Sequence, residues 1–441
     1  MADSTHLLVK EQFDTDEADE LRVLARRLAE DAPEIASAVC HLLRTFDDAV
    51  ASSQHPAEAE LAAETFARRL RAAWLTAAGA EAASVYRSPT AREARQIARH
   101  HDAFGYERDL QPESLEARCR AFFPSPPAGW RQDHILFSSG QAAMTSALLA
   151  LGGHLAPGGQ LRVMHRGAYF ETTSLLRQLS FLDEATFAQA ADLVIDEPVC
   201  CDGQFHQIDT GKLLASGASP PAVIFDTTLQ GRDDGIDRYL AALDPHADQT
   251  VLRVTSCLKL FEAGLELANA GILSVYQRSS IEKKLCEDIR RVRTLTGAGL
   301  NLVDVIALEA PFFLDPAYAD RYARPVFDNN ARLINVVAES NKRFVPISHP
   351  ALVGGDAPYC AFQLLDASPE AWDALENEIA SEIRRRSLVF AHGGSFGFRG
   401  HRYEIVRPET GAPPFLRIAL GRRGGWSCDG IIEMRSGIAA K

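Results

Sequence analysis

The sequence has 441 residues and is short of long apolar runs, of basic charge and of lysine. Its apolar runs, such as residues 147–151, fall far below the ~20 residues that a membrane-spanning helix needs. The first twenty residues are acidic and contain no basic stretch followed by an apolar one, so they predict no secretory signal. We therefore expect a cytoplasmic protein with no membrane partner.

Basic residues are outnumbered: 59 Asp and Glu stand against 46 Lys and Arg, for a formal charge of −13. This balance argues against nucleic acid as the main partner. None of the eight cysteines forms a C-x-x-C pair, so we expect reduced thiols, no disulfide framework and no bound metal. His100, His101 and His165 are likewise expected to be polar residues of a helix surface or core rather than metal ligands.

The composition, with 46% hydrophobic and 24% charged residues, is that of a globular protein with a large core. From about residue 15 to residue 100, apolar residues repeat at three- and four-residue steps, which predicts a helical N-terminal extension over residues 1–104. Over residues 105–324, short β-rich runs alternate with helical segments, which predicts an α/β domain with a mostly parallel sheet flanked by helices. Residues 325–441 predict a smaller α+β domain, with a long helix over residues 328–344.

The first group of candidate site residues lies where the run HILFSS leads into Gly140 and a helix. A turn of small residues at a helix N-terminus presents free backbone N–H groups and the positive end of the helix dipole, which suits a phosphate. The alternative role for Ser139 is that of a plain N-cap.

Two further candidates follow predicted buried strands. Asp226 ends the run PAVIFD, at the edge where parallel sheets bind ligands, although a turn-capping aspartate is the commoner role. Lys259 follows the run VLRVTSCL. Burial there would lower the pKa of its amine and favour Schiff-base chemistry, whereas a lysine taken at random is more often solvated.

Together these residues form a stronger pattern than any of them alone. A phosphate turn, the aromatic Tyr169, a strand-end Asp226 and a strand-end Lys259 follow one another along the chain. They correspond to the four parts of a pyridoxal phosphate site: a phosphate anchor, a residue that stacks on the ring, a carboxylate for the pyridine nitrogen and the Schiff-base lysine.

From about residue 106 to residue 420, the chain resembles the fold-type I pyridoxal-phosphate enzymes of the cystathionine γ-synthase/β-lyase group. FSSGQAAMTSALLAL is similar to the family's phosphate loop, GAYFETT to its stacking segment, VIFDTT to its aspartate segment and TSCLKL to its lysine segment. The resemblance implies that pyridoxal 5′-phosphate is the cofactor. Its implied contacts are Ser139, Gly140, Gln141, Tyr169, Asp226, Ser256 and Lys259, with Lys259 and Tyr169 as the catalytic residues.

The resemblance also implies partners for this site. GYERDLQPESLEARCRAFF looks like the segment in which a tyrosine and an arginine reach the phosphate of the neighbouring subunit. This carries over to Tyr106 and Arg108 and implies a homodimer or tetramer with shared active sites. GGSFG and PFLRIALG are similar to the substrate-binding segments, which implies that Ser395 and Arg417 bind the substrate, with Arg417 on its α-carboxylate.

The chain departs from the family in four places. Leu258 stands where the family has a hydroxyl before the lysine, and no N-P segment precedes Asp226. The segment after the lysine is FEAGLELANAG, and about 100 helical residues precede Tyr106. These departures leave cofactor binding expected and put the identity of the substrate in doubt.

The sequence therefore predicts a lyase or transferase that eliminates or replaces a β- or γ-substituent of an amino acid carrying a sulfur or O-acyl leaving group. An alternative is a biosynthetic enzyme that makes a vinylglycine-type intermediate, with S-adenosylmethionine among the candidate substrates, and forms a C–C bond. An aminotransferase and an amine-sensing regulator are further alternatives. The regulator is disfavoured because the extension is acidic and has no basic recognition helix.

Overall fold

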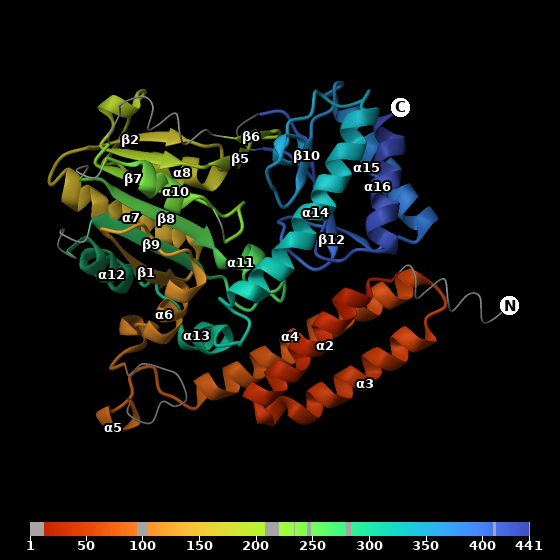
Figure 1. Ribbon diagram of the computed structural model, residues 1–441, viewed down its shortest axis with the longest axis horizontal. Coiled ribbons are helices and arrows are strands. Elements are labelled where there is room, and N and C mark those ends of the chain that lie inside the picture. Colours follow the sequence, from red (N-terminus) through yellow and green to blue (C-terminus); the bar gives the residue numbers. More distant parts are fainter. Residues whose placement is uncertain are drawn as a thin grey trace.

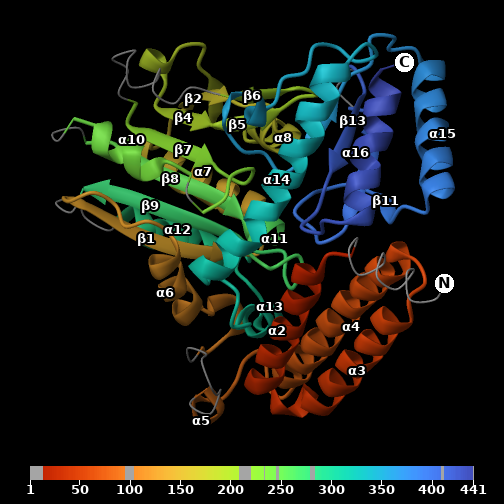
Figure 2. The same ribbon diagram turned by 45° about the vertical axis from the view of Figure 1, so that its right-hand side comes forward.

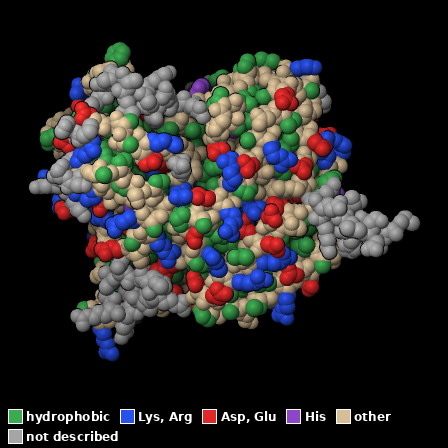
Figure 3. All heavy atoms as spheres, viewed as in Figure 1, with side chains coloured by type: hydrophobic (Ala, Val, Ile, Leu, Met, Phe, Trp, Pro, Cys, Tyr) green, Lys and Arg blue, Asp and Glu red, His purple; other side chains and the backbone are tan. Residues whose placement is uncertain are grey.

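The computed structural model describes residues 13–94, 104–207, 220–232, 234–244, 248–278, 284–408 and 412–440. Figures 1 and 2 show three parts: a helical bundle, a large sheet covered by helices, and a smaller sheet with its own helices. Over the described residues, no helix has both the length and the apolar character required to cross a membrane. On the face in Figure 3, acidic and basic side chains are interspersed.

The N-terminal bundle consists of α2 (Thr15–Asp31), α3 (Ala36–Ser52) and α4 (Pro56–Ala83), with the short η1 (Pro33–Ile35) between α2 and α3. Asp14 caps α2 by accepting from the N–H of Glu17 at 2.9 Å. Proline at the first position and a capping box from His55 begin α4. This confirms the predicted helical character of these residues.

The bundle is not isolated from the rest of the chain. Trp74 of α4 donates its indole N–H to the carbonyl of Ala307 at 2.8 Å and lies in one apolar core with Val305 and Leu308. The short α5 (Ala91–Ala94) and η2 (Glu107–Asp109) lie on either side of a stretch outside the described residues. Both views place the bundle beneath the large and the small sheet (Figures 1 and 2).

The large sheet has seven strands in the order β1-β9-β8-β7-β4-β2-β3. Only β9 runs against its neighbours, so the sheet is mostly parallel as expected. The strands are β1 (Trp130–Phe137), β2 (Leu161–Arg166), β3 (Leu182–Glu184), β4 (Leu193–Asp196), β7 (Ala222–Asp226), β8 (Thr250–Ser256) and β9 (Gly271–Arg278). A separate pair, β5 (Val199–Cys201) and β6 (Phe205–Gln207), reaches toward the smaller sheet.

Helices cover both faces of the large sheet. α7 (Gly140–Leu155) and α12 (Lys284–Thr296) pack on one face, and α10 (Ile236–Ala242) packs on the other. The inward residues alternate along each strand, so Ile224 faces α7 while Phe225 faces α10. The remaining elements are α6 (Glu113–Phe122), α8 (Phe170–Gln178), η3 (Ala188–Ala190), α11 (Cys257–Leu260) and α13 (Leu302–Leu308).

The smaller sheet has the order β10-β13-β12-β11. Its strands are β10 (Cys360–Phe362), β11 (Phe390–His392), β12 (His401–Val406) and β13 (Phe415–Ala419), and α15 (Pro369–Arg386), α16 (Trp426–Ala439) and η4 (Pro350–Val353) accompany them. Leu375 of α15, Ile431 of α16 and Leu416 of β13 share its apolar core. This agrees with the α+β texture expected for the C-terminal residues.

α14 (Pro316–Ser340) connects these parts and differs from the prediction. We expected a helix over residues 328–344, but the helix begins twelve residues earlier and continues through Pro325. Tyr318 and Tyr322 are buried beside the bundle, whereas Leu333 packs in the core of the smaller sheet. The expected boundary between residues 324 and 325 therefore falls inside one helix that both cores share.

Candidate active site

The carboxyl ends of the parallel strands gather most of the predicted site residues at one edge of the large sheet. β7 ends at Asp226, β8 ends at Ser256, and β1 leads into the turn before α7. Gly140 lies against Ser256, because a Cβ on this glycine would be 3.6 Å from the Cβ of Ser256. The turn and the end of β8 are thus direct neighbours.

The turn at the start of α7 is held by its own hydrogen bonds. Ser139 caps the helix: its hydroxyl accepts from the N–H of Ala142 at 3.0 Å. Gln141 donates from its side chain to the hydroxyl of Thr172 at 3.3 Å, which ties α7 to α8. The N-cap role of Ser139 that the sequence left open is therefore real, and its hydroxyl retains a proton to donate to a ligand.

Asp226 is a carboxyl in a protected position. One oxygen accepts from the N–H of Thr228 at 3.0 Å. Burial raises its pKa to about 6, against the effect of Thr228, and the nearby Glu197 adds to the rise. A half-buried carboxyl with a raised pKa is stabilised by a cationic ligand.

Lys259 lies in α11, directly after β8, and points toward the smaller domain. Its amine donates to the hydroxyl of Ser395 at 2.6 Å and lies 5.4 Å from the ring centre of Phe396. Burial, and then the charge of Arg417, lower the pKa of this amine from its ordinary value. Ser395 has φ of 70°, a left-handed conformation that is strained for a serine, so the contact is enforced by the surrounding structure.

Tyr169 stands at the turn from β2 into α8, and Glu197 holds this turn. The Glu197 carboxylate accepts from the N–H groups of Ala168 at 2.9 Å and Tyr169 at 3.0 Å, and it contacts Nε2 of His165 at 2.9 Å. A Cβ on Gly167 would lie 2.2 Å from the Glu197 side chain, so a larger residue there would displace the carboxylate that holds this turn.

Arg417 differs from the expectation of a guanidinium open to a substrate carboxylate. It lies on β13 and forms an ion pair with Glu404 on the neighbouring strand β12. Its Nε is buried and has no hydrogen-bond partner among the described residues. The guanidinium expected to bind the substrate carboxylate is thus paired with a carboxylate of this chain.

Tyr106 and Arg108 are not brought to this edge. Arg108 lies over the ring of Tyr106 at 5.3 Å from its centre, and Tyr106 is 48% exposed. Glu107 between them accepts from the N–H of Leu302 at 3.1 Å, which fixes the segment against α13. Among the described residues, no hydrogen bond or ring contact joins either side chain to Lys259 or the α7 turn.

Sequence reasoning missed Glu197, His165 and Glu404 as members of the site. His165 was expected on a helix surface or in the core, but it lies in β2 and contacts Glu197. The position of Glu197, directly after a buried strand, is the signal that could have found it. His100 and His101 lie outside the described residues.

No protein-family model and no curated protein matches the sequence. Solved structures do match the fold. A methionine γ-lyase from Micromonospora echinospora is 18% identical, with 81% of this chain and 92% of that chain covered and a TM-score of 0.53. The cystathionine γ-lyase from yeast is 16% identical, with 76% and 88% covered and a TM-score of 0.52.

A cystathionine γ-synthase from Xanthomonas oryzae pv. oryzae, solved with cystathionine, is 17% identical, with 76% of this chain and 88% of that chain covered and a TM-score of 0.53. At these identities the likeness concerns the fold. It confirms the fold class expected from the sequence, the fold-type I architecture with a mostly parallel sheet and a smaller C-terminal α+β part.

Proposed function

We propose that the chain is a pyridoxal-phosphate-dependent enzyme that eliminates or replaces a β- or γ-substituent of an amino acid with a sulfur or O-acyl leaving group. The observation that carries the proposal is the common edge of Lys259, Asp226 and the α7 turn, in the fold of γ-lyases and a γ-synthase. Each residue comes from a different strand end, which is where α/β sheets bind ligands.

The residues fit this cofactor. Asp226 is a half-buried carboxyl that a protonated pyridine nitrogen would complement. The first turn of α7, with Ser139 and the nearby Ser256, would hold the phosphate, together with Gly140 and Gln141. Lys259 would bind the aldehyde carbon, and Tyr169 would lie on the ring.

When bound, the cofactor supplies a cationic ring that withdraws electrons from the substrate Cα. The lowered pKa of Lys259 leaves more of its amine unprotonated near neutral pH, as a group that removes and returns protons at Cα and Cβ requires. Burial and then Glu171 raise the pKa of Tyr169, so its phenol stays protonated and acts as a donor.

Arg417 would bind the substrate α-carboxylate, with Ser395 beside it. Since Glu404 already pairs with Arg417, substrate binding includes an exchange of one carboxylate for another. The exposed Tyr106 and Arg108 would reach the phosphate in a second copy of the chain, which makes a homodimer or tetramer part of the proposal.

The test is an assay of the purified protein, loaded with pyridoxal phosphate, on three substrates: cystathionine, an O-acylhomoserine and S-adenosylmethionine. Release of a 2-oxo acid and ammonia from either of the first two supports elimination, and formation of a new thioether with added cysteine supports replacement. Turnover of S-adenosylmethionine alone would favour the C–C-bond-forming alternative. Transfer of the amino group to an added 2-oxo acid without loss of a substituent would contradict the proposal.

A further inference from the structure

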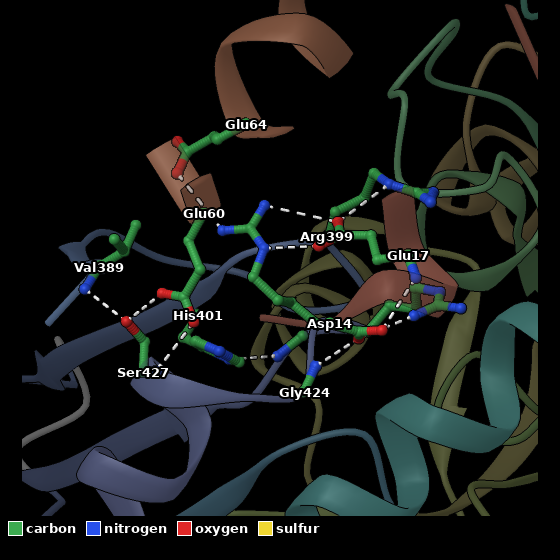
Figure 4. Close-up of polar contacts among 12 residues, drawn as sticks. Asp14, Glu17, Glu60, Glu64, Val389, Arg399, His401, Gly424 and Ser427 are labelled. Carbon is green, nitrogen blue, oxygen red and sulfur yellow. Dashed lines mark hydrogen bonds and ion pairs between the residues drawn. The ribbon is translucent and has the colours of Figure 1, made fainter. Parts of the chain in front are cut away.

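The N-terminal bundle is joined to the smaller domain by a buried ionic cluster (Figure 4). Glu17 and Glu20 of α2 meet three arginines that are 6% exposed or less: Arg399, Arg422 and Arg423. Glu20 accepts from Arg399 at 2.7 Å and from Arg422 at 2.5 Å, and Glu17 accepts from Arg423 at 2.6 Å. These charges have no water to replace a lost partner.

The arginines of the cluster keep Glu20 ionised despite its burial. Burial opposes ionisation of Glu20, but Arg399 and Arg422 outweigh it and keep the pKa of Glu20 below its ordinary value. Tyr318 of α14 also donates to Glu20 at 2.7 Å. One side chain of the bundle thus joins α14, the segment before β12 and the segment after β13.

Arg399 links this cluster to the segment that contains Ser395 and to the residues after Lys259. Its guanidinium donates to the carbonyl of Ala263 at 3.0 Å, four residues after Lys259. The neighbouring Gly397 has φ of 80°, and a Cβ there would lie 1.8 Å from the carbonyl oxygen of Lys259. Residues 395–399 are therefore packed directly on the backbone of Lys259.

A second contact leads from the bundle to the segment after Lys259. Arg71 of α4 donates to the carbonyl of Glu266 at 2.9 Å. Glu266 and Ala263 both have positive φ, of 49° and 53°, so this segment is held in a strained course. The helical extension and the segment FEAGLELANAG, the two departures from the family noted above, therefore touch each other.

We propose that the N-terminal bundle is a positioning element of the candidate active site: through Glu20–Arg399 and Arg71–Glu266 it fixes residues 261–268 and 395–399, and so holds the Lys259 amine against Ser395. The proposal deepens the proposed function, on which it rests for the reactivity of Lys259. Glu20, Arg399 and Arg71 are positioning residues, since none touches the Lys259 amine.

The test measures the apparent pKa of the Lys259 amine in cofactor-free protein. The protein is labelled with a trace of acetic anhydride between pH 6 and 11, and acetylation of each lysine peptide is quantified by mass spectrometry. Exposed Lys342 is the internal reference. In Glu20→Gln, the loosened segments hydrate Lys259 and raise its apparent pKa by about half a unit, a ~3-fold fall in the unprotonated fraction at pH 8.

Two further variants keep the result interpretable. Arg71→Met retains the apolar part of the side chain, so it replaces Glu20→Gln in the test if that variant does not fold. It should also raise the apparent pKa of Lys259. Glu60→Ala is the matched control: Glu60 also joins the bundle to the C-terminal part, but through the N–H of Ser427 at 2.9 Å. It should lower thermal stability and leave the Lys259 titration unchanged.

An unchanged Lys259 titration in both Glu20→Gln and Arg71→Met would overturn the proposal. So would an equal shift in Glu60→Ala, because the effect would then be general loosening of the bundle. The labelling needs no cofactor. A chain that fails to bind pyridoxal phosphate but shows the expected shifts would refute the proposed function and leave the positioning role intact.

Discussion

At the scale of single residues, the site combines groups whose ionisation is energetically unfavourable in the absence of a ligand. Asp226 is a half-buried carboxyl with a raised pKa, and Lys259 is an amine with a lowered one. Each environment disfavours the charged form, mainly by burial. Such opposed shifts at one sheet edge are typical of functional sites.

The Asp226 carboxyl should destabilise the cofactor-free protein near neutral pH. Its pKa is about 6 in the folded chain and ~3.9 when unfolded, so stability is lost as pH rises through that window. We expect Asp226→Asn to raise the free energy of unfolding by ~1–3 kcal/mol at pH 7.5, with no gain at pH 4. Thermal melts at both pH values measure this, and an equal gain at both would contradict it.

Glu404 should compete with the substrate for Arg417. In Glu404→Gln the guanidinium no longer has an anionic partner, so we expect KM for the amino-acid substrate to fall ~10-fold, with a smaller change in kcat. Steady-state kinetics check this. If KM rises instead, Glu404 serves to position Arg417. Arg417→Lys, which loses the planar fork, should raise KM in either case.

At the scale of elements, the turn from β2 into α8 is shaped around one carboxylate. Gly167→Ala would push a methyl group into Glu197, which we expect to cost ~1–3 kcal/mol and to weaken cofactor binding through Tyr169. Gly153→Ala in α7 is the matched control, since nothing lies within 4 Å of its added Cβ. Thermal melts and cofactor titration compare the two, and equal behaviour would remove this role from Glu197.

Elements with strong patterning were predictable from the sequence. The helix expected after the run HILFSS is α7 (Gly140–Leu155), and the buried strand expected from the run VLRVTS is β8 (Thr250–Ser256). The predicted start of α14, at residue 328, is wrong, because the helix continues through Pro325. The burial of Tyr318 and Tyr322 stabilises the helix on the N-terminal side of this proline.

The site was predictable from the sequence only for residues that come directly after an apolar run that forms a strand. Ser139, Asp226 and Lys259 each come directly after an apolar run, so the topology of the sheet gathers them. The Glu20–Arg399 pair joins residues 379 positions apart, and nothing local marks either as buried. Pairing of charges over such distances depends on tertiary packing, which periodicity does not reveal.

At the scale of the whole molecule, the three parts share cores and buried charges. α4 packs on α13, α14 enters two cores, and α2 pairs with arginines near the C-terminus. The site edge therefore depends on segments from the beginning, middle and end of the chain. Only Tyr106 and Arg108 remain apart from it within one copy.

A shared active site predicts complementation between copies. Lys259→Ala and Arg108→Ala should each be inactive alone. Refolded together, they should form mixed dimers in which one site receives both native residues. We expect about a quarter of the wild-type activity at equal mixing, because half of the dimers are mixed and each has one intact site. Activity that stays at the level of the separate variants would contradict sharing.

The most direct test of the central claim is to capture the cofactor on Lys259. The protein is incubated with pyridoxal phosphate, reduced with borohydride, digested and analysed by mass spectrometry. We predict one stable pyridoxyl adduct, on the peptide containing Lys259, and its loss in Lys259→Ala. Labelling spread over the other lysines, or none at all, would contradict a pyridoxal phosphate site at this edge of the sheet.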